Sequence, residues 1–314
     1  MIKKIIEKIK YELQFNNPHY YRRISEKIFK TNYQRLLRKK LSKLSPITPD
    51  KENAKLTVAT LANKKRFYES VAALYSFCFW KRDICLHYHE DGTLTEKNID
   101  FLKKLFPGIT IFRRREQNLK VKDQLLSKGL SNCAQLRGEF FLSIKLFDMI
   151  YEKNTPYLLH IDSDVLFFSR PDEILNIIEE GNFNGCYNVD VDIAYSFDNV
   201  TIAKYIYVPM INRFNSGLLL HNFNEELFDF VDAVMKDNHQ SKSPWHLEQT
   251  LLAMYASYKG NFLGLPESYD LGRRQKKLGN KITSEHYVHN TGYEFHKDFI
   301  YKISPLYKSS KKTN

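Results

Sequence analysis

Several features that would narrow the class of protein are missing from this chain of 314 residues. Its four cysteines form no C-x-x-C pair and no spacing typical of a zinc site, so we expect scattered buried thiols in a reducing compartment. No run approaches 18 apolar residues and no signal-peptide pattern is present, which argues against a membrane-spanning segment and predicts a cytoplasmic protein. There is no internal repeat, and no nucleic-acid-binding module accompanies the basic residues, so nucleic acid is not an expected partner.

The chain does contain enough apolar sequence for a large core. Hydrophobic residues make up 43% of it, which suits one large α/β domain with an extension. The positive charge is unevenly distributed, because residues 1–45 hold thirteen Lys or Arg against three Glu, a local charge of +10 in a chain that carries +12. With the Pro-containing linker at 45–50, this predicts a basic helical extension at residues 1–50 and a main domain at residues 51–314.

The first fifteen residues have the pattern of a basic amphipathic helix. Their apolar residues fall at helical spacing on one side: Ile2, Ile5, Ile6, Ile9 and Leu13. Such a helix packs on the main domain or a partner helix, or it lies on an anionic membrane surface, and the sequence leaves both open. The second alternative predicts a peripheral protein at the inner face of the membrane.

The most informative stretch is Tyr157 to Arg170, in which a mostly apolar run leads directly into Asp162, Ser163 and Asp164. Before it, Glu139 to Glu152 has helical periodicity. We predict a helix and then a buried strand that ends in two carboxylates. Because ligands of open α/β sheets bind beyond the carboxyl ends of strands, this acidic pair is placed to hold a divalent cation against a phosphorylated ligand.

The rest of the chain alternates strands and helices, which is typical of an open nucleotide-binding sheet. Further strands are predicted at Lys55–Leu61, Asp83–His87, Thr110–Arg113, Gly185–Val189 and Phe214–His221, and further helices at Arg66–Trp80 and Trp245–Tyr258.

Four segments carry a resemblance to a known family. They are Lys145-Leu146 to Asp162-Ser163-Asp164-Val165, Asn215-Ser216-Gly217-Leu218-Leu219-Leu220, Glu248-Gln249, and His289-Asn290-Thr291-Gly292. In order and spacing they resemble the GT-A glycosyltransferases, most of all the branch that contains glycogenin and the bacterial lipopolysaccharide galactosyl- and glucosyltransferases. The resemblance covers roughly residues 55 to 295. It implies a GT-A fold, which is a Rossmann-like mixed, mainly parallel sheet flanked by helices.

The resemblance also implies a metal site. Asp164 would bind the metal directly, Asp162 would bind the metal, the ribose or both, and His289 would be the third ligand. His286 and His296 are nearby alternatives to His289 that we set aside. Since imidazole suits Mn²⁺, the expected ion is Mn²⁺, with Mg²⁺ the alternative.

The donor implied is a nucleotide diphosphate sugar, with a uridine diphosphate sugar favoured. Thr60 and Asn63 match the positions that meet the base and ribose. Lys145 matches a basic residue that contacts the phosphates or the sugar, although it could instead extend along the surface of an amphipathic helix. Asn215 and Ser216 match a strand edge that lines the donor sugar, next to a glycine that allows close approach.

Glu248 and Gln249 take the place of the acidic-Gln pair beneath the anomeric carbon, and they are the predicted catalytic residues. The family usually has Asp at the first position. The resemblance implies a retaining enzyme, but Glu248 as a general base would give inversion, so the stereochemistry stays open. Asp190, in a second Asp-x-Asp, is a weaker candidate for binding a sugar hydroxyl.

The sequence therefore predicts a metal-dependent glycosyltransferase that moves a sugar to a hydroxyl of a glycan or glycolipid. The resemblance implies a hexosyltransferase of bacterial surface polysaccharide synthesis. A sugar nucleotidyltransferase would need a glycine-rich loop after the first strand, where this chain reads ANKKRF. A non-catalytic, membrane-associated carbohydrate-binding protein would not need Asp162, Asp164 and His289.

Overall fold

The computed structural model describes residues 31–238, 244–272, 279, 281–288 and 293–309. The chain divides into two compact units, one of residues 45–288 and one of residues 1–44 with 289–314. The predicted amphipathic helix in the first fifteen residues lies outside the described residues. Among the helices that are described, none has the length and apolar character needed to cross a bilayer.

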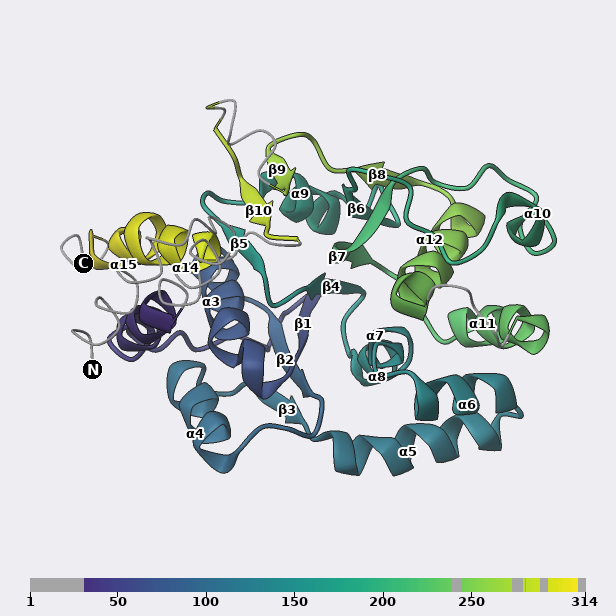
Figure 1. Cartoon of the computed structure of the whole chain (residues 1–314), viewed down its shortest axis with the longest axis horizontal. Helices are drawn as coiled ribbons and strands as arrows, with labels where there is room; N and C mark the ends of the chain where they lie inside the picture. Colours follow the sequence, from purple (N-terminus) through teal and green to yellow (C-terminus); the bar gives the residue numbers. More distant parts are fainter. Residues whose placement is uncertain (1–30, 239–243, 273–278, 280, 289–292, 310–314) are drawn as a thin grey trace, which may run out of the picture. The chain divides into compact units, whose positions relative to one another are not determined.

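The larger unit is built on a seven-stranded sheet with the order β3-β2-β1-β4-β7-β6-β8 (Figure 1). The strands are β1 (Leu56–Ala62), β2 (Cys85–Glu90), β3 (Thr110–Phe112), β4 (Tyr157–Ile161), β6 (Gly185–Val189), β7 (Phe214–His221) and β8 (Phe262–Gly264). Only the pairs that β7 makes with β4 and β6 are antiparallel. The predicted mixed, mainly parallel sheet of an α/β fold is confirmed.

A second sheet of three strands adjoins the first. Its strands are β5 (Val165–Phe167), β10 (Ser284–His286) and β9 (Tyr269–Leu271), in the order β5-β10-β9. β10 runs antiparallel to β5, and in their register His286 is paired with Val165. This pairing brings a late histidine beside the end of the Asp-x-Asp motif, although the two are far apart in the sequence.

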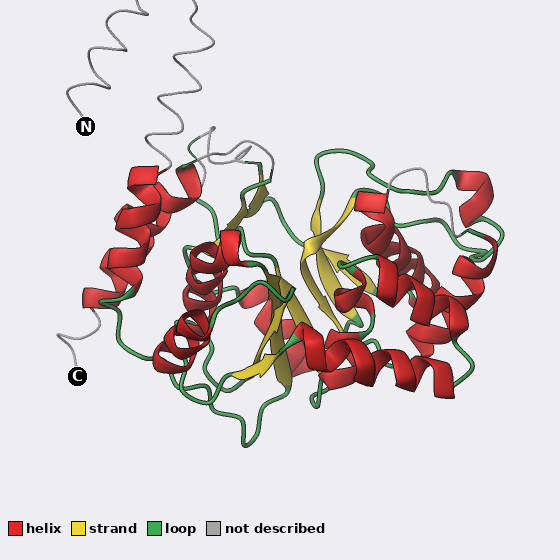
Figure 2. Ribbon diagram, turned by 60° about the horizontal axis from the view of Figure 1, so that its bottom comes forward, coloured by secondary structure: helices red, strands yellow, loops and turns green. Residues whose placement is uncertain are grey.

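Helices cover both faces of the large sheet (Figure 2). They are α3 (Phe67–Cys78), α4 (Glu96–Leu105), α5 (Arg114–Ser127), α6 (Ser131–Glu139), α7 (Ser143–Leu146), α8 (Asp148–Glu152), α9 (Asp172–Glu180), α10 (Asn199–Ile202), α11 (Glu226–Asp237) and α12 (Leu247–Lys259), with 3₁₀ turns η1 (Lys64–Arg66) and η2 (Pro244–His246). The central strands β1, β4 and β7 are buried along their whole length, as expected for strands covered on both faces.

The single helix predicted over Glu139–Glu152 is wrong, because the chain forms two short helices there. α7 and α8 meet at Phe147, whose φ of −113° and ψ of −63° depart from a continuous helix. The reason lies in the buried polar groups. The Arg137 guanidinium, at the end of α6, donates two hydrogen bonds of 2.6 and 2.8 Å to Asp148, and both side chains are almost fully buried. The break turns Asp148 toward Arg137 while Lys145, one turn earlier, is also buried.

The smaller unit is helical in its described part. Residues 31–41 are helical, and α14 (Glu294–Asp298), the π-helical turn η3 (Phe299–Ile303) and α15 (Ser304–Ser309) follow near the end of the chain. The ring of Tyr33 stacks on that of Tyr293, with centroids 5.3 Å apart. Aromatic stacking therefore joins the two ends of the chain within this unit.

We expect Asp148→Ala to lower the free energy of unfolding by about 3–5 kcal/mol, because it leaves the Arg137 charge buried without a partner. Urea denaturation followed by circular dichroism measures the change. The matched control is Glu96→Ala, which removes a carboxylate that is 76% exposed and paired with Arg113, and which should cost at most about 1 kcal/mol. Equal effects of the two substitutions would contradict the structural role of the buried pair.

Candidate functional site

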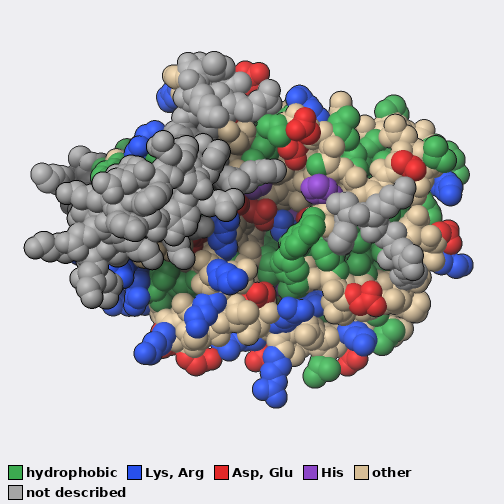
Figure 3. Space-filling model, viewed as in Figure 1, with side chains coloured by type: hydrophobic (Ala, Val, Ile, Leu, Met, Phe, Trp, Pro, Cys, Tyr) green, Lys and Arg blue, Asp and Glu red, His purple; other side chains and the backbone are tan. Residues whose placement is uncertain are grey.

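A cavity of about 420 Å³ opens at the carboxyl ends of β1, β2 and β4. The start of β7, the end of β10, the turn that leads into α7 and the start of α12 complete its lining. Figure 3 shows acidic, basic, histidine and hydrophobic side chains gathered around the hollow on this face. The location agrees with the expectation that ligands of such sheets bind beyond the carboxyl ends of the strands.

Asp162, Asp164 and His286 form a candidate metal centre in this cavity. One ligand atom from each lies within 4.8 Å of the others. His286 Nε2 is 3.2 Å from Asp164 Oδ1 and 4.0 Å from Asp162 Oδ2. Burial opposes the charged form of both His286 and Asp164, but their hydrogen bond and mutual attraction outweigh it, so the pKa of Asp164 is lowered and the pKa of His286 is raised.

The surroundings of the triad fit a divalent cation. His286 Nδ1 lies 3.1 Å from Asn215 Oδ1, and a proton on Nδ1 donated to that oxygen leaves Nε2 directed at the two carboxylates. A Cβ added at Gly217 would lie 2.2 Å from His286 Cε1 and 2.9 Å from Asp162 Oδ2, so only glycine leaves room for the triad. Two carboxylates and an imidazole are ligands that suit Mn²⁺.

His289, which the sequence predicts as the third metal ligand, lies outside the described residues, and its role stays a prediction. His286, which the sequence analysis set aside, is the histidine that the described residues bring to the acidic pair. A strand of three residues has too little periodicity to reveal its pairing, so the approach of β10 to β5 was not visible in the sequence.

Lys145 and Glu248 lie beside the triad. Lys145 Nζ is 2.7 Å from Asp162 Oδ1 and 3.8 Å from Glu248 Oε1, and its side chain is 5% exposed, so the alternative of a lysine extended along the surface is wrong. Burial would lower the pKa of Lys145, but Asp162 and Glu248 raise it above its ordinary value. Burial raises the pKa of Glu248, whose Oε2 accepts a hydrogen bond of 3.0 Å from the Ser216 hydroxyl.

The remaining predicted sugar-site residues hold one another in place. Gln249 accepts a hydrogen bond from the Ser216 backbone N–H and donates one to the Ala194 carbonyl. Asn215 donates to Asp190 Oδ2 at 2.9 Å. Asp190 therefore supports Asn215 from behind, whereas Asn215, Ser216 and Gln249 line the cavity.

The residues that follow β1 and β2 also contribute to the lining of the cavity. Asn63 lines it and accepts a hydrogen bond from the Arg66 backbone N–H through its side chain, as the N-cap of η1. Thr60 is buried within β1 and is not part of the lining. Arg66 and Asp91 also line the cavity, and neither was predicted. Asp91 directly follows β2, just as Asp162 directly follows β4. An aspartate at the end of a predicted strand is the sequence signal that could have indicated Asp91.

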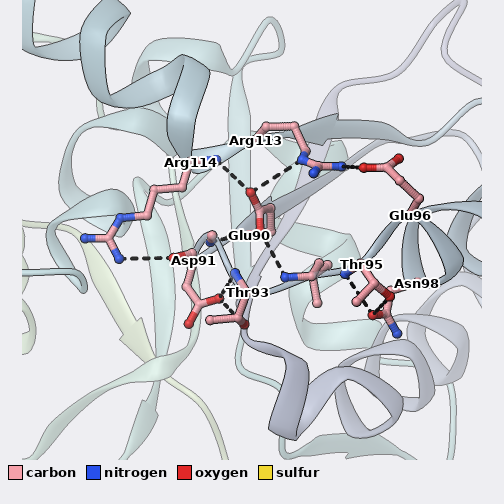
Figure 4. A network of polar contacts seen from close by, with 10 residues as sticks. Glu90, Asp91, Thr93, Thr95, Glu96, Asn98, Arg113 and Arg114 are labelled. Atoms are coloured by element: carbon pink, nitrogen blue, oxygen red, sulfur yellow. Dashed lines mark hydrogen bonds and ion pairs between the residues drawn. The ribbon is translucent and has the colours of Figure 1, made fainter.

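A polar network fixes the loop that carries Asp91 (Figure 4). At its centre, the buried Glu90 carboxylate accepts hydrogen bonds from the backbone N–H groups of Gly92 at 2.8 Å and Arg114 at 3.0 Å. Arg113 Nε lies 3.6 Å from the same carboxylate. The Arg114 guanidinium donates to the Asp91 carbonyl, so the backbone of Asp91 is positioned from two sides.

Comparison with known proteins identifies the fold. No protein-family model and no curated protein sequence matches the chain. Among solved structures, galactosyltransferase LgtC with donor and acceptor sugar analogs matches with a TM-score of 0.50 and 14% identity, over 78% of this chain and 95% of LgtC. The bifunctional glycosyltransferase WbbM also gives 0.50 at 14% identity, over 82% of this chain and 52% of WbbM. Mouse xyloside xylosyltransferase 1 gives 0.49 at 15% identity, over 78% and 99%.

The likeness to LgtC and WbbM shows the fold, and the predicted GT-A fold is confirmed. This chain thus combines the fold of these glycosyltransferases with a candidate metal triad at the end of a central strand.

We expect the protein to bind one Mn²⁺ per chain at the triad. Asp164→Asn or His286→Ala removes one of three ligands and should weaken binding by at least about tenfold. Mn²⁺ electron paramagnetic resonance, which measures free ion, gives the affinity without any assay of activity. The matched control is Asp192→Asn, which changes the exposed aspartate of the second Asp-x-Asp and should leave the affinity unchanged. Equal affinity in Asp164→Asn and the unaltered protein would exclude this site.

Proposed function

We propose that the chain is a metal-dependent glycosyltransferase that moves a sugar from a nucleotide diphosphate to a hydroxyl of an acceptor. The observation that carries the proposal is the placement of Asp162, Asp164 and His286 in a GT-A fold, next to the buried pair of Lys145 and Glu248. A leaving diphosphate must be stabilised by positive charge. In this cavity the charge would come from a metal ion held by the triad and from the Lys145 ammonium group.

Each group has a role that follows from its position. A divalent cation held by Asp162, Asp164 and His286 would stabilise the charge of the leaving diphosphate as a Lewis acid. Lys145 lies where its ammonium group can also contact a phosphate oxygen or a sugar hydroxyl. Asn63, which lines the cavity directly after β1, would face the nucleoside.

Glu248 and Gln249 form the floor on which the donor sugar would lie. The Glu248 carboxylate is fixed by the Ser216 hydroxyl and would stabilise positive charge that develops on the sugar ring in the transition state. One solved LgtC structure is described as an active-site mutant in which glutamine becomes glutamate, and Gln249 is the cavity glutamine of this chain. We propose retention of configuration, and the anomeric proton coupling of the product distinguishes it from inversion.

Donor and acceptor follow from the same resemblance. We propose a uridine diphosphate hexose as donor and a hydroxyl of a glycan or glycolipid as acceptor, in bacterial surface polysaccharide synthesis. LgtC was solved with donor and acceptor sugar analogs, which supports a sugar acceptor here.

We expect nucleoside diphosphate release from at least one nucleotide sugar in the presence of Mn²⁺, and none in EDTA. Glu248→Gln keeps the shape of the side chain but removes its charge, and should lower kcat by about 10² to 10³. A coupled assay of nucleoside diphosphate over a panel of nucleotide sugars measures both. The control, exposed Glu267→Gln, should keep full activity. Undiminished turnover in EDTA would contradict the metal-dependent reaction.

We also propose that the smaller unit binds an anionic membrane surface, which would bring the enzyme to a lipid-linked acceptor. Its support is the local charge of +10 in residues 1–45. In the described part of this segment, Arg35, Arg38, Lys39 and Lys43 are exposed. Each basic residue near such a surface contributes on the order of 1 kcal/mol, screened over about 8 Å at physiological salt.

Sedimentation with vesicles tests this surface. The full chain should bind phosphatidylglycerol vesicles at low salt and dissociate at high salt, and changing the four exposed basic residues to Gln should weaken binding roughly tenfold or more. The matched control changes four exposed lysines of the larger unit: Lys97, Lys103, Lys104 and Lys122. If both variants bind as the unaltered chain does, the basic segment is not a membrane-binding surface.

A further inference from the structure

Trp245 is a large apolar side chain that the fold leaves mostly exposed. It lies in η2, directly before α12, and its side chain is 69% exposed although it lines the cavity. Tryptophan is highly buried on average, so an open indole in a polar cavity points to a surface that a ligand covers. The ring of Phe141 contacts the indole edge-on, at 75° with centroids 6.3 Å apart.

Trp245 lies on the same helical side as Glu248 and Gln249, which form the floor of the cavity. Trp245, Glu248 and Gln249 are three and four positions apart along the continuous segment of η2 and α12, so they share one helical face. Glu248 is 2% and Gln249 is 7% exposed, in contrast to the indole. One face therefore changes from a buried polar floor to an exposed aromatic rim within a single turn.

This combination has the chemistry of a sugar site. A pyranose ring has a face of C–H groups and hydroxyls around its edge. Aromatic rings stack on the C–H face, and polar side chains form hydrogen bonds with the hydroxyls. The floor lies next to the triad that would hold the diphosphate, so the donor sugar would occupy the floor. A ring that arrives from solvent meets Trp245 first.

We propose that Trp245, supported by Phe141, is the platform on which the sugar ring of the acceptor stacks, a proposal that rests on the proposed glycosyl transfer. Trp245 is then a residue that determines acceptor specificity. Leu142, which also lines the cavity, extends the apolar rim beside Phe141.

Kinetics with simple acceptors test the platform. Methyl glycosides of glucose, galactose, mannose and N-acetylglucosamine serve as acceptors, with the donor that releases nucleoside diphosphate in the panel. Trp245→Ala should raise the acceptor KM by roughly tenfold to a hundredfold, since the stacked apolar area is lost. The donor KM and the slow hydrolysis of donor without acceptor should stay within about twofold. Trp245→Phe should keep most of the acceptor affinity, whereas Trp245→Leu should behave as Trp245→Ala.

A matched control is Tyr207→Ala, which removes an aromatic side chain that is 95% exposed and does not line the cavity. It should leave every constant unchanged. A rise in the donor KM of Trp245→Ala at constant acceptor KM would overturn the proposal, as would full acceptor affinity in Trp245→Leu. Failure of the proposed function is distinct, because the unaltered protein would then release no nucleoside diphosphate from any donor.

Fluorescence gives a readout without turnover. The chain has two tryptophans, Trp80 and Trp245, so Trp80→Phe leaves Trp245 as the reporter. With Mn²⁺ and uridine diphosphate present, the methyl glycosides should shift its emission to shorter wavelength in a saturable way. Mannitol, an open-chain polyol without a ring face, should have no such effect. No saturable change with any glycoside, or an equal change with mannitol, would overturn the proposal.

Discussion

The site depends on one corner of the backbone, at which an extended chain leaves the large sheet and enters the small one. β4 pairs with β1 and β7, and after Asp162, Ser163 and Asp164 the chain continues as β5, which pairs with β10. The Asp162 N–H donates to the Gly217 carbonyl at 2.7 Å, and the Asp164 carbonyl accepts from the Tyr287 N–H at 2.9 Å. Because both sheets bind this corner, the two carboxylates have little freedom to move.

The corner brings several charged side chains together where little water reaches them. Each carboxylate has its own polar or charged partner. Asp162 pairs with Lys145, and Asp164 pairs with His286. Glu248 has the Ser216 hydroxyl and, at 3.8 Å, the same lysine. A buried carboxylate without such partners would be protonated or would destabilise the fold. The pairs therefore fix the carboxylates in position, and the contact with His286 lowers the pKa of Asp164.

How far the sequence predicts this structure depends on the range of the interactions involved. β6 and β7 were predicted at the bounds the structure has. The acidic pair was predicted because the mostly apolar run that forms β4 leads directly into it in the sequence. His286 was missed, since only the pairing of β10 with β5 places it there. The break at Phe147 was missed because it arises from the buried pair of Arg137 and Asp148, a tertiary contact that helical periodicity does not contain.

The segments before α7 and before α12 have the same order of side chains, apolar residues followed by a buried charged residue. In the turn before α7, Phe141 and Leu142 precede the buried Lys145 by four and three positions, and Trp245 precedes the buried Glu248 by three. In a helical segment that spacing corresponds to a rise of about 5 Å on one side. Each segment thus changes from an apolar rim to a charged floor within one turn, and the two rims meet where Phe141 contacts Trp245. A ligand that covers the rims would exclude water from the floor and strengthen the interactions of Lys145 and Glu248 there, because their effective dielectric would fall.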